Sequence, residues 1–352
     1  MIPDIGIANG IMSAVLNFAK AMPEDIKFDI VYFFEKQPSR QEEIEALGGR
    51  VYKIDKPSPK DLLSSKLNSF FNEHKGEWSA LHIHQPHFAG FIAPSAKKAG
   101  ICKICVHCHS SVFSLKGNSK RNQLLNLYEK YFISDKFACS ALAGKFWYGN
   151  KPFTVINNAI DCAKYSFNEE LRSAVRISLN ADNRFIVGHI GRTDIPQKNH
   201  RFLIEVFSEV VKRKRDSILL LIGAVETDEL TELCRQLDIS DKVRFLGMRN
   251  DVSDLLQACD VFLFPSTREG LPVSVIEAQA SGLPVVMSDS VTDECCVTDL
   301  VTTMPLSSPA SSWADAVCSA DSNVRRNTYD ELCRAGWDLT AVTKQLSEYY
   351  MN

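Results

Sequence analysis

The chain has 352 residues, of which 45% are hydrophobic and 24% are charged, a composition typical of a globular protein long enough for two domains. No apolar run reaches the roughly 20 residues that a membrane-spanning helix needs, and no charged-then-apolar leader opens the sequence, so we expect a cytoplasmic protein. The 11 cysteines are an odd number and are scattered along the chain, which favours reduced thiols over a disulfide framework.

The net charge of −3 is unevenly distributed along the chain. Residues 1–158 contain 20 Lys and Arg against 14 Asp and Glu, a balance of +6, whereas residues 159–352 contain 20 against 29, a balance of −9. The segment 97–151 contains 10 basic and 2 acidic residues. It is either a solvated positive face or a surface for an anionic partner, and under the second interpretation we predict peripheral contact with the inner face of a membrane.

In the first half, short apolar runs alternate with helical patterns. Strands are predicted at 28–34, 50–54, 80–84, 103–107, 136–140 and 154–161, and helices at 11–22, 40–47, 59–73, 90–99 and 124–133. This alternation predicts right-handed βαβ units and a parallel, doubly wound sheet. Only Met1 to Ile5 precede the loop at Asn9 and Gly10, so we expect the first strand, which normally lies in mid-sheet, to be missing.

Five of the eight histidines lie between His82 and His109, interleaved with Cys102, Cys105 and Cys108. A zinc site built on this cysteine-rich run is rejected, because side chains alternate along a strand and Cys105 would point away from Cys102 and Cys108. His84 and His109 each follow the carboxyl end of a predicted strand, which is where ligands bind in open α/β sheets. The polar loop at 114–122 is expected to be mobile.

Beyond residue 160 the composition becomes acidic and loop-like, and a second βαβ pattern follows. Strands are predicted at 185–192, 217–223, 243–246, 260–264 and 284–287, helices at 199–211, 227–237, 252–258 and 272–281, and a helical end at about 311–352. Arg192 and Lys198 flank a strand-to-helix loop that contains Gly191. Two cations in such a loop suit a diphosphate, although ordinary solvated cations would have the same spacing.

The segment from Asp260 to Pro284 is a predicted strand, loop, helix and strand that carries two glutamates. Gly270 is expected to let the backbone turn, and Pro272 to take the first helical position. Glu269 lies in the loop beside the helix N-terminus, and Glu277 lies about a turn and a half inside the helix. The pair either contacts a bound ligand or is surface charge, and the spacing alone does not decide between these.

Three motifs resemble family 4 of the retaining glycosyltransferases, in particular enzymes of bacterial exopolysaccharide and capsular polysaccharide synthesis. They are Gly188-His189-Ile190-Gly191-Arg192 with Lys198-Asn199, Glu269-Gly270-Leu271-Pro272 with Glu277-Ala278, and Asn158-Ala159-Ile160-Asp161. The resemblance covers nearly the whole chain. The sequence departs from the family pattern in the missing first strand and in Asn9 and Ala159, where glycine is usual.

The resemblance implies a GT-B fold with two Rossmann-like domains. Residues 1–160 form the acceptor-side domain, residues 161–336 bind the nucleotide-sugar, and a C-terminal helix at about 337–352 packs back on the first domain. The implied catalytic residues are His109, Arg192, Lys198 and Glu269, and the implied donor-binding residues are Asn9, Gly10, Gly191, Gly270, Leu271, Pro272, Val273 and Glu277. No metal and no cofactor are implied, because the two cations would neutralise the departing diphosphate.

The implied reaction transfers a hexose-type sugar, with retention, from a nucleotide-sugar to an acceptor hydroxyl. A UDP-sugar donor, a saccharide or lipid-linked saccharide acceptor and no nucleic acid are expected. Glu269 would accept hydrogen bonds from the sugar hydroxyls, Glu277 would bind the ribose hydroxyls, and His109 would lie near the anomeric carbon. Two alternatives stay open, a non-hydrolysing nucleotide-sugar epimerase and an inactive GT-B subunit that binds a partner.

Overall fold

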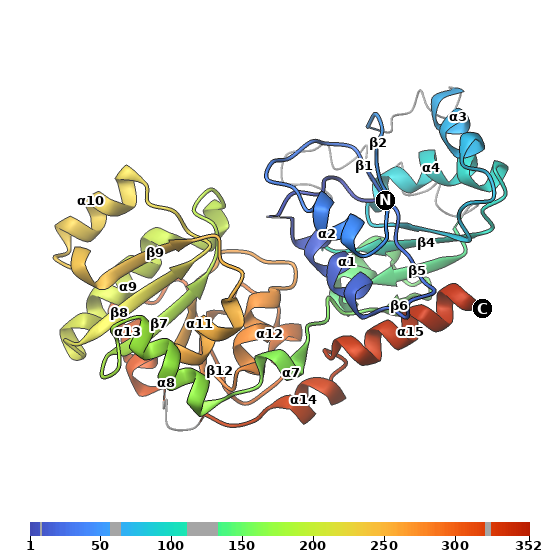
Figure 1. The fold of residues 1–352 in the computed structure, drawn as a ribbon. Helices are drawn as coiled ribbons and strands as arrows, with labels where there is room; N and C mark the ends of the chain where they lie inside the picture. The colour runs from blue at the N-terminus through green and yellow to red at the C-terminus, as the bar shows by residue number, and fades with distance from the viewer. Residues whose placement is uncertain (8, 57–64, 111–132, 321–324) are drawn as a thin grey trace. The chain divides into compact units, whose positions relative to one another are not determined.

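The structure is a computed structural model that describes residues 1–7, 9–56, 65–110, 133–320 and 325–352 (Figure 1). It divides into two compact units, residues 1–160 with 338–352 and residues 161–337. The loop predicted at 114–122 and all but the last residue of the helix predicted at 124–133 lie outside the described residues. No helix of the described ranges combines the length and the apolar character needed to cross a membrane.

The first unit contains parallel strands connected by helices. Strands β3 (Ala80–Ile83), β4 (Lys103–Cys108), β5 (Asp135–Ala138) and β6 (Thr154–Val155) pair in that order, and β1 (Ile30–Tyr32) pairs with β2 (Val51–Lys53). The helices are α1 (Gly10–Ala21), α2 (Gln41–Ala46), α3 (Ser65–Glu73), α4 (Pro86–Lys98), α6 (Ala141–Tyr148) and the C-terminal α15 (Leu339–Met351). Helix α6 lies where the sequence predicted no element.

Residues 1–3 lie between β1 and β3, where they form an isolated bridge rather than a regular strand. Ile2 forms a parallel bridge with Tyr32, and its N–H donates to the carbonyl of Val31 at 3.0 Å. On the other side, the N–H of His84 donates to the carbonyl of Met1 at 2.9 Å. These three residues therefore occupy the mid-sheet position and are hydrogen-bonded on both sides.

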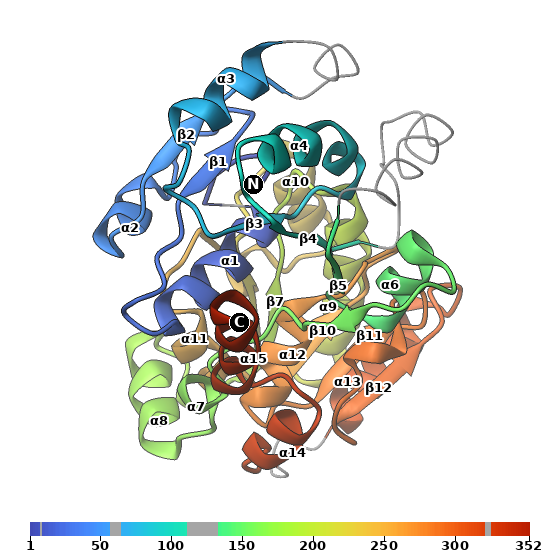
Figure 2. The same cartoon turned by 90° about the vertical axis from the view of Figure 1, so that its right-hand side faces the viewer.

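The C-terminal helix belongs to the first unit. Ala14 and Phe18 of α1 share a buried cluster with Phe137 of β5 and with Val342 and Leu346 of α15. Figures 1 and 2 both show α15 beside α1. Burial of these apolar side chains holds α15 to the unit, although about 180 residues of the second unit separate it in sequence from β6.

The second unit contains a six-stranded parallel sheet in the order β12-β11-β10-β7-β8-β9. The strands are β7 (Phe185–Ile190), β8 (Ser217–Ile222), β9 (Val243–Gly247), β10 (Val261–Phe264), β11 (Val285–Ser288) and β12 (Val301–Met304). The chain builds outward from β7 through β8 to β9 and then resumes on the opposite side at β10. This reversal makes the boundary between β7 and β10 the topological switch point, where open α/β sheets bind ligands.

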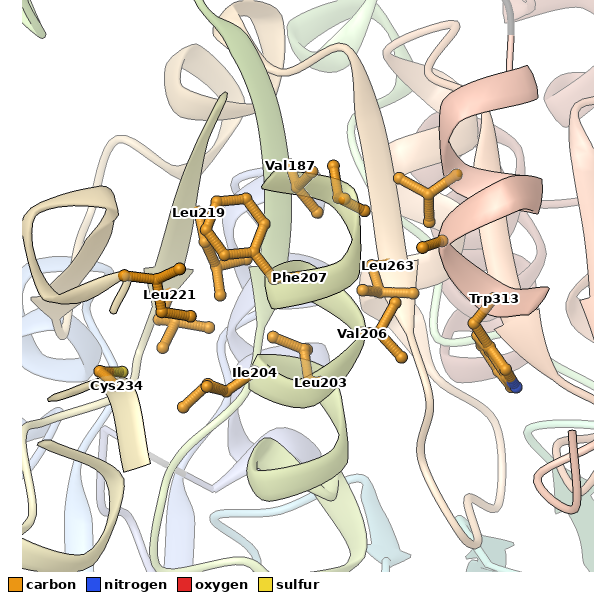
Figure 3. Packing of buried hydrophobic residues seen from close by; sticks show 14 of the residues in the cluster. Val187, Leu203, Ile204, Val206, Phe207, Leu219, Leu221, Cys234, Leu263 and Trp313 are labelled. Atoms are coloured by element: carbon orange, nitrogen blue, oxygen red, sulfur yellow. The ribbon is translucent and has the colours of Figure 1, made fainter. Parts of the chain in front are cut away.

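Helices cover the sheet of the second unit. They are α7 (Cys162–Tyr165), α8 (Glu169–Ser178), α9 (His200–Arg213), α10 (Asp228–Gln236), α11 (Val252–Ala258), α12 (Val273–Ala280), α13 (Ala310–Ser319) and α14 (Tyr329–Arg334), with short 3-10 helices η3 (Pro196–Lys198), η4 (Ser240–Lys242) and η5 (Asp293–Cys295). In Figure 3 the apolar side of α9, with Leu203, Val206 and Phe207, faces the alternating strand residues Val187 and Leu219. Trp313 of α13 is fully buried in the same cluster.

Two elements of this unit differ from the sequence prediction. Helix α8 occupies a stretch predicted as loop, and none of its residues is buried. Strand β12 at the sheet edge was also missed, because its pattern Val-Thr-Thr-Met is partly exposed throughout. Neither element changes the order of the strands that frame the switch point.

Candidate functional site

The residues predicted from the two strand-loop-helix motifs meet at the switch point. Strands β7 and β10 pair directly, with Val187 opposite Val261. Gly191 and Arg192 follow the carboxyl end of β7, and the loop from Pro265 to Gly270 follows that of β10. Parallel pairing therefore places two loops that lie more than 70 residues apart in sequence at one edge of the sheet.

Two hydrogen bonds tie these loops together. The backbone N–H of Thr267 donates to the carbonyl of Gln197 at 2.8 Å, and the side-chain amide of Asn199 donates to the carbonyl of Pro265 at 3.1 Å. Asn199 adopts the left-handed conformation, with φ 57° and ψ 44°, which asparagine tolerates better than most residues. Asn199 thus ends the turn that holds Lys198 and anchors this turn to the β10 loop.

Lys198 and Glu269 form an ion pair in this frame, with Nζ 2.9 Å from Oε1. Their side chains are only 17% and 19% exposed, so solvent screens this pair less than a surface pair. The ammonium also lies 4.7 Å from the centre of the Phe264 ring. In this arrangement the carboxylate of Glu269 neutralises the charge of the ammonium.

Gly191 is needed to let Lys198 reach this position. A Cβ atom on Gly191 would lie 3.0 Å from Cγ and Cδ of Lys198 and 2.7 Å from Nε2 of His189. Any side chain there would displace the lysine stem. Arg192, the next residue, is 36% exposed, and the ion pair that it forms with a described residue is long, 3.4 Å from its Nε to Asp194, so it is held far less tightly.

The loop before α12 differs in detail from the prediction. The helix begins at Val273, and Pro272 is the N-cap with φ −78° and ψ 101° rather than the first helical residue. Gly270 is not among the glycines with positive φ, so its backbone needs no left-handed turn. The N–H groups of the first turn still follow Gly270 and Leu271, at the edge of the sheet where Glu269 lies.

Glu277 is half-buried rather than fully solvated, and Tyr165 of α7 holds it. The Tyr165 hydroxyl donates to Oε1 of Glu277 at 2.9 Å. Burial raises the pKa of Glu277 above its ordinary value, while the Tyr165 hydrogen bond, Lys164 and Lys198 oppose that shift. The sequence did not indicate Tyr165, because its partner lies 112 positions away.

We predict that Tyr165→Phe raises the pKa of Glu277, because it removes a hydrogen bond that favours the carboxylate form. If Glu277 holds the ribose of a nucleotide-sugar donor, as the resemblance implies, the donor KM should rise about 10-fold and kcat should stay within about threefold. The acid limb of kcat/KM should also move to higher pH, since the lost bond lowers the Glu277 pKa. Steady-state kinetics across pH measure both effects. Tyr329→Phe, a change of the same kind in α14, is the matched control, and equal kinetics in the two variants would contradict the prediction.

Two further polar groups of this edge were not singled out from the sequence. Nδ1 of His189 donates to the carbonyl of Leu263 at 2.8 Å, and its Nε2 is buried without a partner. The Ser266 hydroxyl, directly after β10, is also buried and unpartnered. His189 lies near the end of β7, and Ser266 lies two residues after β10. Nε2 of His189 and the Ser266 hydroxyl can therefore form a hydrogen bond with a ligand or a water.

In the first unit, the structure brings His84 and His109 together as the strand ends predicted. Nδ1 of His84 and Nε2 of His109 are 2.8 Å apart, and Nδ1 of His109 is 3.0 Å from Oδ1 of Asn158. Burial lowers the pKa of His109 to about 4. Both ring nitrogens of His109 therefore have protein partners, and the ring is neutral at neutral pH.

Asn9 and Gly10 open helix α1. Oδ1 of Asn9 accepts from the N–H groups of Ile11 and Met12 at 3.0 and 3.3 Å, and its amide donates to the carbonyl of Asp4 at 2.8 Å. Most of the Asn9 side chain is thus used in capping the helix. Gly10 has no atom within 4 Å of the place where a Cβ would lie, so the backbone at this helix start is open to approach.

Comparison with known proteins places the chain in a family. The family model described as "Glycosyl transferases group 1" matches residues 184–322. The glycosyltransferase EpsF of Bacillus subtilis is 30% identical over 326 residues, which cover 88% of this chain and 84% of EpsF. The chain belongs to the group 1 glycosyltransferases.

Other members and solved structures agree with this family. A galactosyltransferase of Escherichia coli that acts on an N-acetylglucosamine-diphosphoundecaprenol is 32% identical over 151 residues, 41% of this chain and 38% of that enzyme. The crystal structure of HepE from Anabaena in complex with UDP superposes with a TM-score of 0.80 over 99% of both chains, at 19% identity. The GT-B fold implied by the sequence motifs is therefore confirmed, and the chain is a glycosyltransferase.

Proposed function

We propose that this group 1 glycosyltransferase transfers a hexose-type sugar, with retention, from a UDP-sugar to a lipid-linked or growing saccharide in bacterial surface polysaccharide assembly. The observation that carries the proposal is the partly buried Lys198–Glu269 pair at the switch point of the six-stranded parallel sheet. HepE, which shares the fold, is described in complexes with UDP and with UDP-glucose, and the E. coli relative uses a UDP-sugar and a diphosphoundecaprenol acceptor. These names support the donor and acceptor classes.

In this proposal the charges of the second unit act on the donor diphosphate. Lys198 exchanges Glu269 for a phosphate oxygen, and the less restrained Arg192 adds a planar guanidinium fork. Both cations stabilise the negative charge that develops as the glycosidic bond to the diphosphate breaks. We propose that these side chains supply the charge for which other transferases use a metal ion, so the reaction needs none.

The two glutamates are then free for the donor hydroxyls. Glu269, once released from Lys198, accepts hydrogen bonds from the sugar, and Glu277 accepts them from the ribose while Tyr165 fixes one of its oxygens. His109 contributes a neutral imidazole, because both of its nitrogens are hydrogen-bonded and its pKa is about 4. No side chain is assigned as the base that takes the acceptor proton.

The raised pKa of Glu277 predicts the acid side of the pH profile. Only the carboxylate form accepts hydrogen bonds from both ribose hydroxyls, so donor affinity falls as pH drops through the Glu277 pKa. Because burial raises that pKa above 4.5, the acid limb of kcat/KM should lie at higher pH than an exposed glutamate would give. Glu277→Gln should abolish this limb, and a limb that persists unchanged in this variant would contradict the assignment.

The function is tested by incubating the full chain with a panel of nucleotide-sugars, with and without a polyprenyl-diphosphate-linked saccharide, and by measuring released UDP and the product by mass spectrometry. We expect UDP release that depends on the acceptor and an α-linked product from an α-linked donor, with activity retained after chelation of metals. Conversion of the nucleotide-sugar without any acceptor would instead show an epimerase. Tight donor binding without either reaction would favour an inactive binding subunit.

A peripheral membrane contact through residues 97–151 remains a prediction. Within the described part of this segment, α6 carries exposed Lys145 beside Leu142 and Phe146, which are 44% and 37% exposed. A basic surface gains about 1 kcal/mol per Lys or Arg at an anionic bilayer. We expect the chain to sediment with vesicles of 30% anionic lipid at low salt and to be released at high salt, whereas Lys145→Glu should weaken sedimentation and Lys212→Glu in the second unit should not.

A further inference from the structure

Three histidines of the first unit form a cluster to which the proposed transfer chemistry assigns no ligand. His82 lies in β3, and His84 directly follows this strand on the same side. His107 lies on the neighbouring strand β4. Because Cys105 pairs with His82 in the parallel register, His107 lies beside His84. One ring nitrogen from each of these three residues lies within 4.8 Å of the other two. The set differs from the cysteine-rich run at 102–109, because its members come from two strands.

Each of the three rings has one nitrogen engaged by the protein and one left open. Nε2 of His107 donates to the carbonyl of Ile156 at 3.1 Å, so its Nδ1, which is buried without a partner, carries a lone pair. The bond from His109 to Asn158 makes Nε2 of His109 an acceptor, so Nδ1 of His84 donates to it and Nε2 of His84 carries a lone pair.

His82 follows the same rule. Its Nδ1 is 2.6 Å from the hydroxyl of Tyr350, and its Nε2 is buried without a partner. The Tyr350 hydroxyl can donate or accept, and in the tautomer whose Nδ1–H donates to the tyrosine oxygen, Nε2 of His82 carries the third lone pair. Metal-binding histidines characteristically donate their second N–H to a carbonyl or hydroxyl in this way, which fixes the tautomer and the ring orientation.

We propose that His82, His84 and His107 form a binding site for one divalent transition-metal ion, of the class that prefers imidazole ligands, such as Zn²⁺, Cu²⁺ or Ni²⁺. Three protein nitrogens with one open position are sufficient for Zn²⁺. Bond lengths of about 2.0–2.1 Å place ligand nitrogens about 3.4 Å apart, so ring rotations of about 1 Å at the nitrogens close the site. Among the described residues, this cluster includes no carboxylate, which disfavours Mg²⁺ and Ca²⁺.

The protonation state and the surroundings fit this role. Burial lowers the pKa of His82, His84 and His107 well below the usual value, so protons do not compete for the nitrogens at neutral pH. A pocket of about 410 Å³ has His82 and His84 in its wall. An ion on Nε2 of His84 would also strengthen the donor bond from its Nδ1–H to His109, and thereby hold the His109 ring more firmly.

The site is tested with the tag-free, chelator-treated full chain, titrated with Zn²⁺ by calorimetry and with Co²⁺ as a spectroscopic probe. We expect one equivalent at micromolar affinity or tighter, and a Co²⁺ spectrum of nitrogen ligands without a thiolate charge-transfer band. His107→Ala should weaken binding about 100-fold or more, and the more exposed His82→Ala provides the same test if His107→Ala fails to fold. His74→Ala and Cys102→Ala, which change other potential ligands of the unit, should bind as the wild type does.

Three results would overturn the proposal. They are the absence of stoichiometric Zn²⁺ binding, equal binding by the wild type and both histidine variants, and a thiolate band that disappears in Cys102→Ala. Because none of these measurements uses a sugar donor, the outcome is independent of whether the proposed transfer reaction is correct.

Discussion

Lys198→Ala lowers the kcat of sugar transfer by about 100-fold or more, the largest loss of activity that we expect from a single substitution. Removing one preorganised donor to a developing negative charge typically costs 10²–10³ in turnover. Lys198 is preorganised by the turn that Asn199 closes, by the open space at Gly191 and by its contact with the Phe264 ring. The substitution also leaves Glu269 without its counter-charge, so the carboxylate would face the incoming diphosphate and weaken donor binding as well.

The measurement is steady-state release of UDP with saturating acceptor, together with donor affinity by calorimetry. Lys212→Ala is the matched control, because it removes an exposed lysine of α9 that pairs with Glu209. Lys198→Arg should recover part of the activity by restoring the charge. If the turnover of Lys198→Ala stays within about threefold of wild type, Lys198 does not stabilise the departing diphosphate.

Asp260→Ala destabilises the second unit by about 3–5 kcal/mol, the largest stability effect that we expect from a polar substitution. Asp260 is 4% exposed and lies between the guanidinium groups of Arg172 and Arg176 of α8. Its Oδ2 also accepts the N–H of Ile186 at 2.7 Å. Alanine therefore leaves two mostly buried cations without a carboxylate and one buried backbone donor unpaired.

Thermal and urea unfolding of the full chain measure this effect, and the corresponding decrease in Tm is roughly 6–20 °C for a unit of this size. Asp241→Ala, which removes an exposed carboxylate of η4 with only a 3.9 Å contact to Lys242, should change Tm little. Asp260→Asn should fall between the two, because it keeps an acceptor for Ile186 but loses the charge. A Tm for Asp260→Ala equal to that of the Asp241 control would show that α8 is not held by this network.

The sequence predicted those parts of the fold and site that depend on neighbours in the chain. The apolar run 261–264, the turn residues after it and the helix with Glu277 are local patterns, and the structure contains all of them. The alternation of strands and helices likewise predicted two parallel sheets. The family and GT-B fold implied by the resemblance are confirmed.

What the sequence could not predict depends on partners brought together by folding. Lys198 reaches Glu269 only because β10 inserts beside β7, and Tyr165 reaches Glu277 across 112 positions. Helix α8 was taken for a loop because polar side chains, above all Arg172 and Arg176, attach it to the unit. The mid-sheet pairing of residues 1–3 was missed because so short a segment shows no pattern.

The two hydrogen bonds from Thr267 to Gln197 and from Asn199 to Pro265 have a consequence for engineering donor preference. Because each loop is hydrogen-bonded to the other, the conformation of residues 191–199 depends on that of residues 265–270, and the two loops should be exchanged together. If only the first loop were replaced by that of another transferase, its lysine would lie in a loop that no longer forms these hydrogen bonds to residues 265–270. Chimeras that exchange both loops together are therefore the smallest exchanges that should preserve turnover while changing the sugar.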